Sequence, residues 1–529
     1  MHLNFTKLLR NLLLVVCMLT GLSVSAKKTF APKEYYWVGG TGNWSDFSHH
    51  WAASSGGTDF YLQIPQSIDN VHFDGNSFTG AGQTVTVNVA AACNNMDWSG
   101  VTNTPTLTNS SGVTINGSLT FVSGMNLSGG NFTFTSTTPA QTITTAGKVM
   151  GVTTYSGTGG GWTFQDNYTT SGTLVHSAGT LNTNGKNVTV PFFQSNSGNT
   201  RSLITGGSLF TLNGSNTQAW IAVSSGLTMS AATSDIILSG TGAQFQGGGA
   251  TYHDVTFTAT TGNNFLTDNS TYHNVSFATS SSIFINGSNT FNDVVLSGTG
   301  NISGTNSYHN LTLTPGFTYT FGGTQTFSGT LNATGTCTSF ITILGTSTFS
   351  SPAAQSVTYV NLQNIHTGGT GSFTATNTID NGGNTGWVIT PLTGKNLYWV
   401  GGSGNWNNGA HWSLTSGGAG LGCTPTSLDN VFFDVNSFTS TGQTVTVNVA
   451  AACNNMDWSG VTNTPTLTNS SGVTINGSLT FVSGMNLSGG NFTFTSTTPA
   501  FRLLYNYPGR SSHRRFPNMS SLPLLFLPL

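Results

Sequence analysis

A short motif recurs along the middle of the chain at nearly constant spacing, and this recurrence constrains the fold more than any other feature. Its copies are YHDVTF (252–257), YHNVSF (272–277), FNDVVL (291–296) and YHNLTL (308–313). Within each copy, apolar residues alternate with polar ones, which is the period of a strand with one buried face. A unit this short cannot bury its apolar face alone, so successive units must stack. The repeat therefore predicts an all-β protein with a parallel β-helix, or β-solenoid, over residues 141–391.

Stacking assigns a role to each position of the motif. Tyr252, Tyr272, Phe291 and Tyr308 begin the four copies, so we expect them to form an aromatic column. An Asp or Asn follows two residues later, as at Asp254. Side chains of this type bond their own backbone at turns, and we expect this position to make a corner that resets the alternation.

The chain is poor in charged residues. Asp, Glu, Lys and Arg make up 5% of it, against about 25% in an average globular domain. Parallel coils place equivalent positions above one another, so a charge repeated in every coil would face like charge one strand away. Ser, Thr and Asn avoid this repulsion and can hydrogen-bond along the stack. All fifteen acidic residues but just four basic ones lie between residues 34 and 500, so nucleic acid is not an expected partner.

A much longer repeat divides the chain into parts. Residues 82–140 and 442–500 are identical letter for letter, and the segments upstream of them match less closely. We therefore expect a capping module at 35–140, the solenoid at 141–391, and a truncated second copy of the capping module at 398–500.

The two ends differ from this body. Residues 1–26 combine Lys7 and Arg10, the apolar run LLLVVCMLTGL and the small residues Val-Ser-Ala, which is the pattern of a signal peptide. This run is too short to span a bilayer comfortably, and we expect no transmembrane segment after cleavage. Residues 501–529 carry four basic residues, four prolines and no acid. A shifted reading frame of Phe-Arg-Leu-Leu can encode Gln-Thr-Ile, the continuation of the first copy, so we interpret 501–529 as an unstructured, frameshifted tail.

Several stretches occur in an order that carries a resemblance. YWVGGTGNWSDFSHHW is followed by DNVHFD (69–74), GQTVTVN (82–88) and NNMDWSG (94–100), and YVNLQNI (359–365) comes later. This series resembles secreted repeat proteins of Gram-negative bacteria that are similar to autotransporter passenger domains and adhesins. The resemblance covers nearly all of residues 35–500. It implies a right-handed parallel β-helix, and it says little about a ligand.

The tryptophan–glycine stretch has two interpretations. The open end of a solenoid exposes strand edges and apolar surface, which need a cap. Trp37, Trp44 and Trp51 can cover that surface, with the neighbouring glycines allowing tight turns. If they were exposed instead, the same three tryptophans would provide a contact surface for carbohydrate.

The cysteines agree with an exported protein. Cys423 and Cys453 lie in the second copy of the capping module, whereas the first copy keeps Cys93 and has Gln63 where Cys423 would align. We therefore predict a Cys423–Cys453 disulfide, with Cys93 and Cys337 as buried thiols; the alternative is that these two pair with each other.

Two groups of residues are candidate metal ligands. His253 and His273 occupy one repeat position, so stacking could bring their imidazoles close enough for a metal ion. Asp69 and Asp74 flank a short strand and either fix turns or bind calcium. Asn replaces His in the intervening copy at 291–296, so the histidines are not expected to form a fixed metal site. Apart from calcium, no cofactor is expected.

No recognisable catalytic motif stands out in the sequence. The expected function is therefore that of a non-enzymatic, secreted or cell-surface, adhesin-like repeat protein, with an extracellular surface or polysaccharide as partner. The alternative is a carbohydrate-binding or polysaccharide-degrading β-helix protein. Aromatic residues beside two or three convergent aspartates in one cleft would favour this alternative, since glycoside cleavage uses a pair of carboxyl groups.

Overall fold

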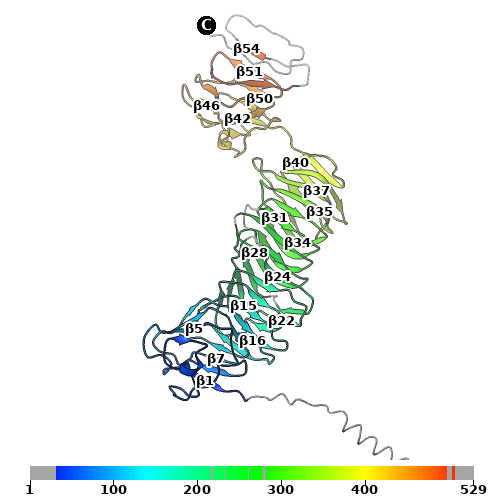
Figure 1. Cartoon of the computed structure of the whole chain (residues 1–529). Coiled ribbons are helices and arrows are strands. Elements are labelled where there is room, and N and C mark those ends of the chain that lie inside the picture. The colour runs from blue at the N-terminus through cyan, green and yellow to red at the C-terminus, as the bar shows by residue number, and fades with distance from the viewer. Residues whose placement is uncertain are drawn as a thin grey trace, which may run out of the picture. The chain divides into compact units, whose positions relative to one another are not determined.

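The computed structural model describes residues 31–215, 218–230, 233–259, 261–277 and 282–496, and the backbone of 503–506. The chain is nearly all β, with 2% helix, and its parallel strands stack into a β-solenoid of about 20 turns, which confirms the predicted fold (Figure 1). Contacts divide it into two compact units, Met1–Ser136 with Gln141–Met150, and Thr137–Ala140 with Gly151–Leu529. Each unit is described by itself below.

The first unit consists of short parallel strands in three sheets. One sheet holds β1 (Glu34–Trp37), β4 (Asn70–His72), β7 (Met96–Asp97), β10 (Leu119–Thr120) and β13 (Gln141–Thr144). The second holds β2 (Gly42–Asn43), β5 (Thr84–Val87), β8 (Thr106–Asn109) and β11 (Asn126–Ser128). The third holds β6 (Ala91–Cys93), β9 (Val113–Ile115) and β12 (Phe132–Phe134), and β14 (Val149–Met150) follows. Parallel stacking therefore begins at β1, within the segment that we expected to be a cap alone.

An antiparallel strand closes the start of this stack. β3 (Trp51–Ala52) pairs with β1 on the edge that β4 does not use, with Tyr36 opposite Ala52. The one-turn helix α2 (Phe47–His50) leads into β3. The unpaired backbone groups at the edge of β1 are thereby satisfied, which removes a template for pairing with another chain.

The second unit starts with coils of three strands. The strands of its first sheet are β15 (Thr153–Tyr155), β18 (Leu174–His176), β21 (Phe193–Ser195), β24 (Gln218–Ala222), β27 (Gln244–Gln246), β29 (Asn263–Thr267), β31 (Ser282–Ile285) and β33 (Gly300–Ile302). Those of the second are β17 (Tyr168–Thr170), β20 (Val188–Val190), β23 (Leu209–Leu212), β26 (Asp235–Leu238), β28 (Thr251–Phe257), β30 (Thr271–Phe277), β32 (Thr290–Leu296) and β34 (Asn306–Leu313). The third is shorter, with β16 (Gly161–Phe164), β19 (Gly179–Asn182), β22 (Arg201–Ile204) and β25 (Leu227–Ser230).

The coil loses one strand part of the way along this unit. In the described part of the chain the third sheet ends at β25, and later coils have two strands. Ile236 pairs with Phe210 of the preceding coil and with Val255 of the following coil. Fewer residues separate Ile236 from Val255 than from Phe210, so the later coil is shorter. The coils then end in longer strands, namely β35 (Thr318–Phe327), β36 (Leu331–Asn332), β37 (Ile341–Ser350), β38 (Gln355–Thr358), β39 (Val360–Gly368), β40 (Phe373–Asp380) and β41 (Trp387–Pro391). The short repeat in the sequence thus belongs to the two-stranded coils.

The aromatic column is present, as predicted. Tyr252, Tyr272, Phe291 and Tyr308 occupy one register position, and Phe327 continues the column. Successive ring centroids are 5.5, 5.3, 5.3 and 5.6 Å apart, with planes within 17° of parallel. All five rings are buried. Each ring fills the coil and packs on the next, so the column ties neighbouring coils together.

The Asx position works differently from our expectation. β28 and β30 run straight through it, and residues 253 and 254 both face outward, which resets the alternation inside a continuous strand. The hydrogen bonds of Asn310 show what the position does instead, because both partners lie on neighbouring coils. Asn310 donates from Nδ2 to Asp293 Oδ1 at 2.8 Å and accepts from the Thr330 amide at 2.9 Å. The position therefore stabilises the stack and does not cap a turn.

The second copy of the capping module repeats the first. Its strands are β42 (Asn396–Trp399), β43 (Gly404–Asn405), β44 (Trp412–Ser413), β45 (Asn430–Phe432), β46 (Thr444–Val447), β47 (Ala451–Cys453), β48 (Met456–Asp457), β49 (Thr466–Asn469), β50 (Val473–Ile475), β51 (Leu479–Val482), β52 (Asn486–Ser488) and β53 (Phe492–Phe494). A 3-10 turn, η1 (Gly409–His411), replaces α2. β44 is again antiparallel to β42, and β45 is parallel to it.

The expectation that residues 501–529 are unstructured is wrong for four of them. β54 (Leu503–Asn506) pairs parallel with β51, with Leu503 opposite Leu479. In the first copy, Ile143 lies opposite Leu119 in the same way. The free edge of β51 offers backbone hydrogen bonds that do not depend on the side chains of the incoming segment. A segment of different sequence, the same number of residues along the chain from β51, can therefore pair there as β13 pairs with β10. The rest of the tail and the signal peptide at 1–26 lie outside the described residues.

The predicted disulfide is also wrong. Cys423 is bonded to Cys337, with Cα atoms 5.7 Å apart and a sequence separation of 86. Cys453 and Cys93 are free and fully buried. Cys453 is an inward-facing residue of β47, where burial raises the pKa of its thiol to about 12. Cys423 lies in the partly exposed loop before β45, and the two residues of the second copy therefore do not meet.

Candidate functional site

The three tryptophans of the first capping module are core residues. Trp37, Trp44 and Trp51 are each 0% exposed. The Trp37 and Trp44 rings pack edge-on against Trp51, with centroids 5.0 and 4.7 Å away. Trp37 Nε1 donates to Gly40 O at 2.7 Å. The alternative interpretation, in which these rings contact carbohydrate, is therefore wrong, because no face of them reaches solvent.

The glycines of this stretch have separate roles. Gly39 and Gly40 adopt φ of +80° and +74°, the left-handed region that favours glycine. Gly42 instead leaves space for an imidazole, since a Cβ there would lie 2.0 Å from His50 Nε2. The His50 ring stacks on Trp37 at 4.5 Å, and its Nδ1 lies 2.7 Å from Val38 O.

The second copy reproduces this packing. The His411 ring stacks on Trp399 at 4.7 Å, and a Cβ at Gly404 would lie 2.2 Å from His411 Nε2. This role of the histidine was not predicted from the sequence, although the dipeptide His-Trp ends the motif in both copies. The motif WVGGxGNW with its distant His-Trp is thus a packing unit of the capping module.

The two aspartates proposed for calcium fix turns. Asp69 is buried, and its two carboxylate oxygens accept the backbone N–H of Lys33 at 3.0 Å and of Gln66 at 2.9 Å. Asp74 Oδ1 accepts the N–H of Asn76 at 2.9 Å. Neither joins a group of metal-ligand side chains in the part of the chain that the structure describes.

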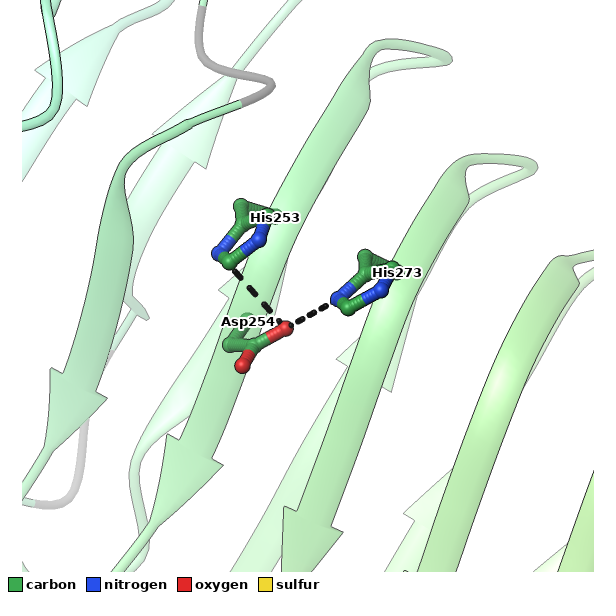
Figure 2. Close-up of side chains that lie close together, drawn as sticks. All are labelled: His253, Asp254 and His273. Carbon is green, nitrogen blue, oxygen red and sulfur yellow. Dashed lines mark hydrogen bonds and ion pairs between the residues drawn. The ribbon is translucent and has the colours of Figure 1, made fainter.

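The histidines of the repeated motif do come together, on the neighbouring strands β28 and β30. The His253 and His273 rings stack with centroids 4.7 Å apart and planes 9° apart. Asp254 Oδ1 lies 2.8 Å from His273 Nδ1 and 3.6 Å from His253 Nδ1 (Figure 2). Asp235, on the preceding strand β26, places its Oδ1 2.8 Å from His253 Nδ1. Carboxylate and imidazole therefore alternate along three strands, and we call these four residues the Asp–His ladder.

Part of this ladder is also a set of potential metal ligands. The ligand atoms of His253, Asp254 and His273 lie within 4.8 Å of one another, which no other group matches among the described residues. Two imidazoles and a carboxylate suit Zn²⁺ and other divalent transition metals. However, the lone pair of an imidazole nitrogen lies in the ring plane, so two nearly parallel rings cannot both direct one to the same ion. As they stand, the carboxylates satisfy both Nδ1 atoms and tie the strands together.

A second cluster of polar side chains is buried inside the three-stranded coils. The Arg201 side chain donates from Nε to Ser195 Oγ at 2.9 Å, and both residues are buried. His176 Nδ1 lies 3.5 Å from the same Oγ, and its Nε2 lies 3.0 Å from Gly179 O. Burial lowers the pKa of His176 to about 4, and the Arg201 charge acts in the same direction, so this imidazole is neutral at physiological pH.

This Ser–His–Arg cluster is structural. All three side chains are at most 1% exposed, so a substrate could not reach the hydroxyl. The sequence alone marks Arg201 only as one of the four basic residues between residues 34 and 500. Arg201 is the one arginine between residues 34 and 500, and this is the signal that could have identified it.

Two further findings bear on function. No described helix has the length and apolar character needed to cross a membrane. Comparison with known protein families, curated proteins and solved structures found no significant match to this chain.

Proposed function

We propose that this protein is a non-enzymatic, adhesin-like repeat protein that acts outside the cell, either secreted or held at the outer surface. In this proposal the solenoid is both the spacer and the contact surface. The proposal takes up the resemblance of its capping modules to those of secreted repeat proteins.

The outward faces of the coils support this proposal most directly. They carry uncharged polar side chains that hydrogen-bond from coil to coil, at positions that lie directly above one another. Ser276 donates to Thr256 at 3.2 Å and Thr314 to Ser297 at 3.2 Å. Such a surface keeps regularly spaced donors and acceptors, about 4.8 Å apart along the stack. Since it carries little charge, contact with another surface does not require the removal of water from charged groups.

The disulfide supports the extracellular location. A bond between Cys337 and Cys423 requires an oxidising compartment, such as the outside of the cell or the periplasm. The signal-peptide pattern at residues 1–26 provides the route to that compartment.

The solenoid also suits a mechanical role. Each coil contacts its neighbours through buried rings, such as Tyr252 on Tyr272, and through side-chain hydrogen bonds, so stability accumulates along the stack. Force or surface contact at one coil is therefore shared with the next coils.

Attachment of coated microspheres tests the proposal. Fluorescent beads carrying the exported chain, and control beads carrying serum albumin, are exposed to glass, polystyrene and polysaccharide-coated surfaces, and the beads that resist washing are counted. We expect several-fold more beads with the chain than with albumin on at least one surface. Equal attachment on every surface would refute the proposal. Release of reducing ends from the polysaccharides would instead support the degrading enzyme considered in the sequence analysis.

A further inference from the structure

One part of the solenoid surface differs from the Ser, Thr and Asn columns elsewhere. Gln194 on β21, Gln218 on β24 and Gln244 on β27 line a hollow of about 400 Å³ together with Phe192. Phe265 on β29 lies opposite Gln244 in the register, and Phe284 on β31 follows it. We call these six residues the glutamine–phenylalanine face.

The aromatic rings of this face are held in place at the surface. Phe265 and Phe284 stack with centroids 4.7 Å apart and planes 15° apart. Both remain partly exposed, whereas Leu266, which follows Phe265, is fully buried, so the two rings lie on the outer side of the strands. Phe192 lies over the backbone of Gly214, where a Cβ would come within 2.0 Å of its ring. The coil therefore has room for the Phe192 ring because residue 214 is a glycine.

The side-chain amides of the three glutamines have no partner in the part of the chain that the structure describes. Among the described residues, no hydrogen bond involves the side chain of Gln194, Gln218 or Gln244. Amides that only stabilise a stack bond each other, as Asn289 Nδ2 does with Asn306 Oδ1 at 3.3 Å. Gln218 and Gln244 are register partners and do not bond in this way, which leaves both amides available to a ligand.

The chemistry of this face identifies the ligand class. A primary amide both donates and accepts hydrogen bonds, as sugar hydroxyls do, and an aromatic ring offers an apolar surface to the C–H groups of a sugar. The hollow has no charged side chain in its lining, so it offers no cation to offset the charge of an anionic group. We propose that the glutamine–phenylalanine face binds an uncharged polysaccharide that lies across neighbouring coils. This inference rests on the proposed function and names the ligand class of its contact surface.

Affinity electrophoresis of the full exported chain tests this inference. Native gels contain one of three neutral polysaccharides (hydroxyethyl cellulose, galactomannan or dextran) or one of two anionic ones (alginate or polygalacturonate). We expect retardation by at least one neutral polymer and none by the anionic ones. The double variant Gln218→Ala/Gln244→Ala should raise the apparent Kd about tenfold or more, because the polar contacts of both amides are lost. Gln363→Ala is the matched control, since Gln363 is an exposed glutamine of β39 outside the face.

The variants separate the possible outcomes. Phe265→Ala/Phe284→Ala should also weaken binding, and circular dichroism checks that it folds. If the phenylalanine variant does not fold, the binding measured for Gln218→Ala/Gln244→Ala alone tests the inference. No retardation by the neutral polymers, retardation by anionic polymers alone, or equal retardation of wild type and the glutamine variant would each overturn the inference. Bead attachment is measured separately. Attachment of the beads without retardation in the gels would refute polysaccharide binding by this face and would leave the proposed function unaffected.

Discussion

The buried guanidinium of Arg201 offers a direct test of how neighbouring coils hold together. Its Nη2 donates to Ser195 O at 3.1 Å and to Val223 O at 2.7 Å. Its Nη1 donates to Asn199 O at 3.0 Å and to Ser225 O at 3.2 Å. One side chain thus satisfies backbone carbonyls in the turns of two successive coils. We predict that Arg201→Met, which keeps an apolar stem of similar size, destabilises these coils.

The expected magnitude is the balance of two opposing effects. Hydrogen bonds from a charged donor contribute about 1.5–3 kcal/mol each, so the five N–H donors of Arg201 contribute about 7.5 kcal/mol at the lower value. Removing a buried charge from a site without a carboxylate partner recovers a desolvation cost of several kcal/mol. The net loss of stability is therefore about 3–4 kcal/mol. Arg201→Lys should be at least as harmful, because an ammonium group has three donors and lacks the planar fork of arginine.

Hydrogen exchange measured by mass spectrometry is the assay, since coils in a solenoid can open locally. Arg201→Met should speed exchange in residues 193–229 by more than a hundredfold, which corresponds to about 3 kcal/mol, with distant coils little changed. Lys186→Met is the control, because it removes a basic residue from the same coils that makes no side-chain hydrogen bond to a described residue. Exchange in 193–229 at the wild-type rate in Arg201→Met would refute the reasoning.

Three further predictions concern other buried groups. His176 stays neutral in the folded chain, whereas in the unfolded chain it gains a proton below pH 6.5. The free energy of unfolding should therefore be unchanged above that pH and fall by about 3 kcal/mol as the pH drops to about 4. Urea midpoints measured against pH should show this loss in wild type and much less of it in His176→Gln. Non-reducing peptide mapping should recover Cys337 joined to Cys423, and a Cys423–Cys453 peptide would contradict the structure. Gly42→Ala should lower the melting temperature by displacing His50 from its ring stack, at a cost of about 1–3 kcal/mol, and Gly124→Ala, where an added Cβ meets nothing within 4 Å, should not.

Part of the candidate site could be predicted from the sequence. The repeat placed His253 and His273 at one position, so their proximity followed once stacking was inferred. Asp235 could not be found in this way, because it belongs to β26, which has no copy of the motif. The glutamine–phenylalanine face was missed for the same reason, since its residues share no spacing in the sequence and meet through the register of five strands.

The sequence by itself determined the architecture. Alternating polarity specifies a strand, and a motif that recurs at a short and nearly constant interval specifies that such strands stack, so Tyr252 on Tyr272 follows from local pattern and translation alone. Only the tertiary structure decided which side chains from unrelated positions meet. Cys423 pairs with Cys337 and not with Cys453, and Trp44 is core and not surface, because loop paths and the inward or outward sense of each strand depend on packing across the whole coil. Repetition encodes contacts between equivalent positions, whereas contacts between unlike positions exist only once the chain is folded.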